Sequence, residues 1–127
     1  MTNHYHLLLE IPRGGLSVGM RELNGGYSRW ANRRHARSGH LFHNRFGSTR
    51  VETDPHLLEV CRYVVLNPVR AGLCPTPKTW GWSSYRACAG LERAPRFLAL
   101  SVLLQLFGPN VRRAQVSFRS FVAATTG

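Results

Sequence analysis

Acidic side chains are scarce in this chain of 127 residues, which has 17 Lys and Arg side chains but only 6 Asp and Glu. Its formal net charge is therefore +11, and Lys78 is the single lysine among the basic residues. Such an excess of positive charge favours a negatively charged partner. The alternative interpretation is that the arginines reflect genome composition and contribute only solubility.

Cysteine and long apolar runs are also scarce. The three cysteines include no C-x-x-C pair, so neither a disulfide framework nor a structural zinc site is expected. No secretory signal precedes the first histidines, and the apolar run at residues 98–107 is interrupted by Ser101 and Gln105. We therefore expect a single cytoplasmic domain with no membrane partner.

The amino-terminal segment contains two histidines around one bulky residue, His4-Tyr5-His6, followed by leucines. Because side chains alternate along a strand, a strand over residues 4–11 would place His4 and His6 on one face. Two imidazoles held side by side form half of a metal site. Two ordinary solvent-facing histidines are the alternative interpretation of so short a pattern.

A helix is predicted over residues 55–66, after the N-cap residue Asp54 and before Pro68. Its apolar positions form one stripe, made up of Leu57, Leu58, Cys61, Val64 and Val65. Tyr63 lies about 160° from the centre of this stripe, and Asn67 follows one turn later on nearly the same face. We therefore predict that the phenol and the amide project together, away from the core.

Another helix is predicted over residues 17–35. Its apolar stripe consists of Met20, Leu23, Tyr27, Trp30 and Ala31. Tyr27 occupies the middle of that stripe and is interpreted as a packing residue. Three arginines recur every four residues and a fourth lies beside them, namely Arg29, Arg33, Arg37 and Arg34. This arrangement favours a nucleic-acid partner, because guanidinium groups bind phosphates bidentately and stack on bases, in contacts that salt weakens.

Three motifs in order resemble one known family. They are His4-Tyr5-His6 with its leucines, the segment from Gly39 through Phe46, and the segment from Arg62 through Leu73. Together they resemble the single-tyrosine HUH transposases, the IS200-like group that includes the REP-associated tyrosine transposases. The resemblance covers residues 2 to about 90 and continues more loosely beyond.

The resemblance implies a metal-dependent endonuclease and strand transferase that acts on single-stranded or hairpin DNA during transposition. By motif match, Tyr63 is the nucleophile, His4 and His6 are metal ligands, and Asn67 is the third ligand. Arg45, in the second motif, joins the DNA-binding arginines. The implied metal is Mg²⁺ or Mn²⁺, although neutral imidazoles generally suit zinc, iron or copper better. Whether the chain acts as a monomer or a homodimer stays open.

This chemistry is physically coherent. A tyrosine phenol with a pKa of about 10 is a poor nucleophile until its proton is removed, and a cation would neutralise a nonbridging phosphate oxygen. The expected 5′-phosphotyrosine intermediate conserves the energy of the phosphodiester, so rejoining needs no ATP. A hydrolytic zinc enzyme is a weaker alternative, because it needs a further histidine or carboxylate ligand.

The pattern of elements predicts an α+β fold, and the resemblance implies a ferredoxin-like HUH nuclease fold with helices on an antiparallel sheet. Further strands are predicted at residues 40–46 and 48–52, and further helices at 97–107 and 111–124. We expect residues 1–90 to form the transposase-like domain and residues 91–127 to form a helical extension of it.

Members of the family have another strand and helix before the histidine strand, so the chain is expected to be truncated at its amino end. An upstream start codon, a partner chain or a decayed fragment would each account for this. An unpaired strand edge would follow, and it motivates a second hypothesis. In that hypothesis the chain is a noncatalytic remnant that binds nucleic acid through its arginine face.

Overall fold

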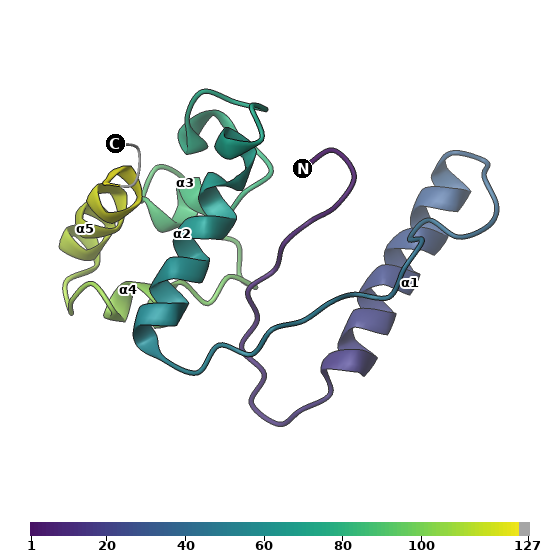
Figure 1. Ribbon diagram of the computed structural model, residues 1–127, viewed down its shortest axis with the longest axis horizontal. Helices are drawn as coiled ribbons and strands as arrows, with labels where there is room; N and C mark the ends of the chain where they lie inside the picture. The colour runs from purple at the N-terminus through teal and green to yellow at the C-terminus, as the bar shows by residue number, and fades with distance from the viewer. Residues whose placement is uncertain (125–127) are drawn as a thin grey trace. The chain divides into compact units, whose positions relative to one another are not determined.

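The computed structural model describes residues 1–124, so the last three residues of the predicted extension lie outside the described part. Its helices, shown in Figure 1, are α1 (Leu16–Arg34), α2 (Asp54–Arg70), the 3-10 helix η1 (Pro77–Thr79), α3 (Tyr85–Cys88), α4 (Leu100–Gln105) and α5 (Val111–Ala123). The chain divides into two compact units. The first unit contains Met1–Leu8 and the residues from Val51 onward, and the second contains Leu9–Arg50. None of the helices in the described part is both long and apolar enough to cross a membrane.

The predicted α+β fold is wrong, because residues 1–124 contain helices but no β-strand. The three segments predicted as strands, residues 4–11, 40–46 and 48–52, have no regular secondary structure. An isolated bridge joins Pro12 to Gly14 outside any strand. A strand needs a neighbour to pair its backbone N–H and C=O groups, and no described segment provides one. The ferredoxin-like antiparallel sheet is therefore not seen in the described residues.

Helix α2 begins as the sequence indicates but runs farther than predicted. The Thr53 hydroxyl, rather than Asp54, caps it by accepting a hydrogen bond from the backbone N–H of His56 at 3.3 Å. The expected end at residue 66 is wrong, since the helix includes Pro68 and reaches Arg70. Proline removes only its own N–H from the helical ladder, and the following turn keeps its hydrogen bonds.

The core of the first unit is formed by α2, α3, α4 and α5. Its buried members are Val65, Leu66, Tyr85, Cys88, Ala89, Leu104, Ala114, Phe118 and Val122. Phe118 is at the centre, with 0% of its surface exposed and its ring centroid 5.9 Å from that of Tyr85 and 5.7 Å from that of Phe107. The predicted helix at 111–124 is confirmed as α5, whereas the one at 97–107 is shortened to α4. Val65 and Leu66 of α2 belong to this core, whereas Tyr63 and Arg70 of the same helix are exposed.

The second unit has one long helix and little core. The predicted helix at 17–35 is confirmed as α1, but only Met20 and Ala31 are buried along it. Tyr27 is 53% exposed, and its ring centroid lies 5.6 Å from that of Trp30 and 6.4 Å from that of Phe42. Tyr27 therefore contacts other aromatic rings, as a packing residue would, while remaining half open to solvent.

Candidate active site

The two amino-terminal histidines lie next to each other although the predicted strand is missing. The ring centroids of His4 and His6 are 5.1 Å apart, with the ring planes at 89°. The ring of His4 is exposed, and its Nδ1 atom forms a 2.7 Å hydrogen bond with the Oδ1 atom of Asn3. His6 is partly buried. The two imidazoles therefore meet in a segment that has no regular secondary structure.

Tyr63 contacts this histidine pair from a segment far away in the sequence. The ring centroids of Tyr63 and His6 are 5.4 Å apart, and the planes meet edge to face at 78°. Tyr63 is 46% exposed, whereas Cys61 and Val65 of the same helix are buried. The prediction that Tyr63 faces away from the core is thus confirmed, and its phenol remains open to a substrate.

Burial and nearby charges favour the neutral form of the His6 imidazole. Loss of hydration lowers its pKa below the ordinary histidine value, and the nearby His4 and the terminal amine lower it further by charge repulsion. The Nε2 atom of His6 is shielded from solvent and has no hydrogen-bond partner, although the ring as a whole is only partly buried. A neutral imidazole with an unpaired nitrogen is the form that binds a metal.

Asn67 follows Tyr63 by one turn of α2. It is partly buried, and its Nδ2 atom is shielded from solvent without a hydrogen-bond partner. Buried amides are normally paired, so this unpaired N–H donor is unusual. The positions of Tyr63 and Asn67 on one side of the helix agree with their predicted common face.

The side chains of His4, His6 and Asn67 carry donor atoms of kinds that divalent cations accept. His4 and His6 offer imidazole nitrogens, and the Asn67 carboxamide could offer an oxygen. No group of three or more His, Cys, Asp or Glu side chains able to hold a metal occurs in residues 1–124. A catalytic zinc site normally has three such protein ligands, so the zinc hydrolase alternative finds no ligand set in this part of the chain.

A shallow groove of about 310 Å³ runs along the exposed face of α2 beside the phenol. It is lined by His56, Glu59, Val60, Arg62, Tyr63 and Arg70. The guanidinium carbon of Arg70 is 5.9 Å from the centroid of the Tyr63 ring. Arg70 lies in the third motif but was given no role from the sequence. Its spacing of seven residues from Tyr63, two turns of one helix face, was the signal that could have identified it.

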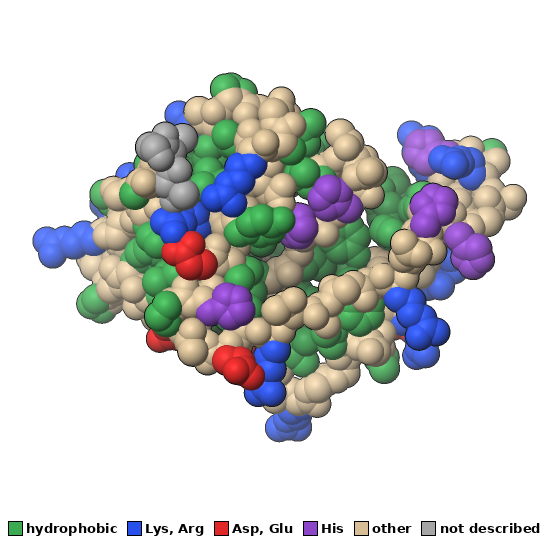
Figure 2. Space-filling model, viewed as in Figure 1, with side chains coloured by type: hydrophobic (Ala, Val, Ile, Leu, Met, Phe, Trp, Pro, Cys, Tyr) green, Lys and Arg blue, Asp and Glu red, His purple; other side chains and the backbone are tan. Residues whose placement is uncertain are grey.

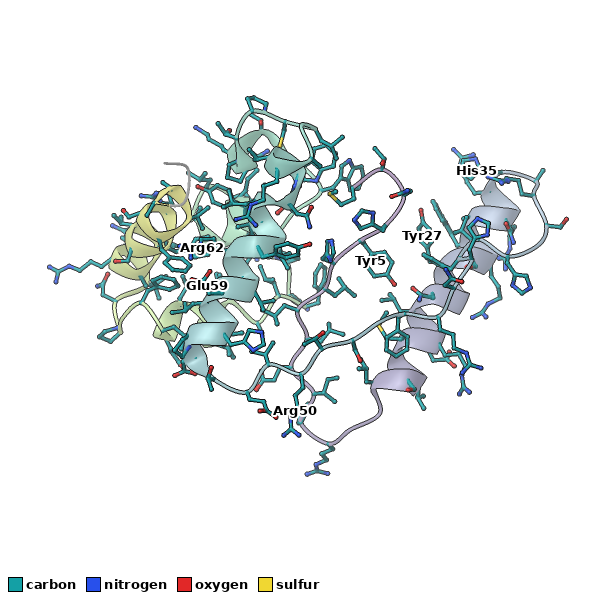
Figure 3. The ribbon with its side chains drawn as sticks, in the orientation of Figure 1. Tyr5, Tyr27, His35, Arg50, Glu59 and Arg62 are labelled. Carbon is teal, nitrogen blue, oxygen red and sulfur yellow. The ribbon has the colours of Figure 1, made fainter. Side chains whose placement is uncertain are left out.

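Glu59 and Arg62, labelled in Figure 3, form an ion pair at one side of this groove. The hydrogen bond from Arg62 holds the pKa of the Glu59 carboxyl below its ordinary value. The only carboxylate lining the groove is therefore already neutralised by a neighbour. An anion in the groove would meet the positive charge of Arg70 with little opposition.

The arginines predicted to bind DNA lie in the second unit. Three of them, Arg29, Arg33 and Arg34, are exposed on α1, and Arg37 and Arg45 are exposed in the segment that follows. A second hollow, of about 360 Å³, is lined by Trp30, Arg33 and Arg34. Figure 2 shows how few acidic side chains accompany the basic ones on the visible face. The role of these five arginines in DNA binding stays a prediction.

Comparison with known families gives one match. A family model described as "Transposase IS200 like" matches residues 1–67, slightly more than half of the chain. The matched range begins before His4 and ends at Asn67, so it includes all four residues assigned to the active site. No curated protein and no solved structure gave a match.

Proposed function

The chain belongs to the IS200-like transposase family, and we propose that it cuts and rejoins single-stranded DNA with Tyr63 as the nucleophile. The observation that carries this proposal is the contact between the rings of His6 and Tyr63 at 5.4 Å. Two residues that are 57 positions apart in sequence meet there. Tyr63 is exposed, as a nucleophile must be, and the Nε2 atom of His6 has no hydrogen-bond partner, as a metal ligand requires. A purely structural aromatic contact would not need an exposed phenol next to an unpaired imidazole nitrogen.

In the proposed reaction, the phenol oxygen of Tyr63 attacks a backbone phosphorus and its proton leaves to water. The bond from phosphorus to the 3′ oxygen breaks, and the departing oxygen takes up a proton to become a 3′ hydroxyl. The product is a 5′-phosphotyrosine, in which the number of phosphate ester bonds is unchanged. A DNA 3′ hydroxyl can then displace the tyrosine oxygen, so the strand is rejoined without an external energy source.

We propose that His4, His6 and Asn67 hold a divalent cation, Mg²⁺ or Mn²⁺. When bound, such an ion supplies Lewis-acid stabilisation of the charge that develops on phosphate oxygens. The lowered pKa of His6 favours the unprotonated ring that a metal ligand needs. Acidification should protonate the His6 imidazole and release the ion, so activity should fall as the pH is lowered below the ordinary histidine pKa of 6.5.

The proposed substrate is single-stranded or hairpin DNA. The formal charge of +11 and the exposed arginines of α1 favour a polyanion, and the hollow beside Trp30 combines an aromatic ring with two guanidinium groups. Aromatic rings and arginines together are typical of surfaces that bind unpaired bases and their phosphates. Affinity should therefore decrease steeply as salt is added.

The decisive experiment looks for the covalent intermediate. The protein is incubated with end-labelled hairpin and single-stranded DNA and with Mg²⁺ or Mn²⁺, and the products are separated under denaturing conditions. A labelled band at the mass of protein plus DNA is expected for the unaltered chain and for Tyr27→Phe. Tyr63→Phe should give none, since it lacks the attacking oxygen. An adduct that persists in Tyr63→Phe would disprove the assignment.

A matched pair of histidine variants tests the cation site. His6→Ala should lose metal-dependent adduct formation, whereas His40→Ala, an exposed histidine of the second unit, should retain it. Manganese binding can be followed independently by the paramagnetic broadening of histidine NMR signals. Broadening of the His40 signal instead of those of His4 and His6 would contradict the proposed ligands.

A second candidate function is DNA binding without catalysis, which the +11 charge and the exposed arginines favour by themselves. It predicts salt-sensitive binding of the same labelled DNA and no adduct with either metal. The adduct assay thus separates the two candidates. Detection of phosphotyrosine at Tyr63 by mass spectrometry would exclude the noncatalytic one.

A further inference from the structure

We propose that the groove along α2 binds the DNA backbone next to the reacting phosphate, with Arg70 as its phosphate-binding residue. This inference rests on the proposed function only in naming Tyr63 as the nucleophile. The groove, of about 310 Å³, is lined by both Tyr63 and Arg70, and it is open to solvent. A phosphodiester placed there would lie within reach of the phenol oxygen and the guanidinium group together.

The backbone of α2 places these groups in one row. His56, Tyr63 and Arg70 are seven residues apart, which corresponds to about two helical turns between neighbours. All three line the groove. Arg70 has its guanidinium carbon 5.9 Å from the centroid of the Tyr63 ring. The row therefore has the nucleophile at its centre, a permanent cation at one end and a titratable imidazole at the other.

Arg62, the other arginine of the groove, is already engaged. It pairs with Glu59, and its guanidinium carbon lies 4.4 Å from the centroid of the Phe121 ring. Arg70, in contrast, makes no ion pair with any described residue. Guanidinium groups bind phosphates through two parallel hydrogen bonds. Arg70 has no such ion pair to break, although it attracts the Glu59 carboxylate at longer range and lies over the Tyr63 ring.

A structural role for Arg70 makes a different prediction. Arg70 is in the last turn of α2, where a positive charge also offsets the negative end of the helix dipole. That role requires a charge but no particular shape, and it would affect stability without affecting DNA. Arg70→Lys and Arg70→Gln separate the two roles, because lysine retains the charge and loses the planar pair of donors.

The test measures binding of a fluorescent oligothymidylate by anisotropy over a range of salt concentrations. Arg70→Gln should weaken binding about tenfold at low salt, and it should reduce the slope of log affinity against log salt by about 0.7, the value for one phosphate contact on a single strand. Arg70→Lys should retain the slope and bind with intermediate affinity. Arg112→Gln, an exposed arginine of α5 outside the groove, is the control for loss of charge.

Equal losses for Arg70→Gln and Arg112→Gln would overturn the proposal, as would an unchanged slope for Arg70→Gln. Thermal unfolding of each variant, followed by circular dichroism, shows whether a loss comes from unfolding. A second measurement uses modification of arginine by phenylglyoxal and peptide mapping. Oligothymidylate should protect Arg70 and leave Arg112 reactive, and failure to protect Arg70 would also count against the groove.

These experiments do not depend on catalysis, so the inference and the proposed function can fail separately. If Arg70→Gln reduces the slope of log affinity against log salt but the unaltered chain forms no adduct, the groove binds DNA and the proposed reaction is wrong. If the unaltered chain forms the adduct and Arg70→Gln binds oligothymidylate normally, the reaction is supported and the role of Arg70 is rejected.

Discussion

The two units of this protein differ in how their helices are stabilised. In the first unit, α2 packs with α3, α4 and α5 around Phe118, which is 0% exposed. In the second unit, α1 is 19 residues long but buries only Met20 and Ala31, and Trp30 is 55% exposed. An amphipathic pattern therefore predicts a helix in both units, but a core forms only where other elements cover the apolar stripe.

The same division separates the two kinds of functional residue. His4, His6, Tyr63 and Asn67 belong to the first unit, and the arginines predicted to bind DNA belong to the second. The proposed chemistry needs side chains held in place, which a packed core provides. Contacts to a flexible polyanion need charge more than fixed geometry. Substitutions in the two units can be compared for their effects on the free energy of unfolding and on DNA binding. Such a comparison tests whether the more tightly packed unit also contributes more to stability and catalysis.

The largest effect is expected from emptying the core of the first unit. Phe118→Ala should lower the free energy of unfolding by about 3–5 kcal/mol, because it removes a buried ring and leaves a cavity. Trp30→Ala in α1 removes an even larger side chain but should cost less than about 1 kcal/mol, since the ring is half exposed. Urea denaturation followed by circular dichroism measures both. Equal costs would contradict the contrast between the units.

A somewhat smaller effect is expected in alkaline solution. Burial, together with the neighbouring Cys88 thiol, raises the pKa of Cys61 from 9.0 to about 11. Between these values the unfolded chain releases a proton that the folded chain keeps, so stability should fall as the pH rises from about 9 to about 11. The loss should reach about 2–3 kcal/mol.

Unfolding midpoints measured across this pH range provide the check. Cys61→Ala should reduce the pH dependence and leave the part that comes from Cys88, whose pKa is also raised by burial. The second unit contains no cysteine, so hydrogen exchange of α1 should not share this alkaline loss. A parallel loss in α1 would show that the two units unfold together.

Removal of a helix cap should have an effect of about 1 kcal/mol. The Thr53 hydroxyl caps α2 and the Asn110 side chain caps α5, each accepting a backbone hydrogen bond. Helix α1 starts after Gly15 without a side-chain cap, so Ser17→Ala should change stability very little. Thermal unfolding of Thr53→Ala, Asn110→Ala and Ser17→Ala tests the contrast. The sequence favoured Ser17 as the cap of this helix, but it lies inside α1, and a large loss in Ser17→Ala would contradict the uncapped start that the structure shows.

The smallest effect on stability is expected from the arginine face of α1. Combined replacement of Arg29, Arg33 and Arg34 by glutamine should change the unfolding free energy by less than about 0.5 kcal/mol per site, because these side chains are exposed. If they bind DNA, the salt slope for single-stranded DNA should nevertheless decrease by up to about 0.7 per arginine. An unchanged slope would restrict DNA binding to the first unit.

The sequence predicted the long helices well and the sheet badly. The periodicity of residues 17–35 and 111–124 reports local geometry, so α1 and α5 were found almost to the residue. The same periodicity correctly placed Tyr63 on the exposed side of α2. Residues 4–11 have the alternation of a strand, yet strand formation depends on a partner elsewhere. No pattern within a segment can show whether that partner is present.

The site was predicted to a similar extent. The spacing of His4 and His6 indicated a histidine pair, and the pair is found without the strand that was meant to hold it. The place of Arg70 was missed, because a cation beside an aromatic ring becomes significant only when both are seen to line one groove. The same limit applies to Asn67, whose unpaired amide cannot be recognised without its surroundings.

By itself, the sequence determined the helices with strong periodicity, the excess of arginine and the motifs that identify the family, since each of these is a property of neighbouring residues. Only the tertiary structure decided that Tyr63 meets His6, that Arg62 forms an ion pair with Glu59 while Arg70 lies over the Tyr63 ring, and that the strand-like segments of the described residues stay irregular. These outcomes depend on contacts between distant segments, whose energies are set by burial and by the availability of partners.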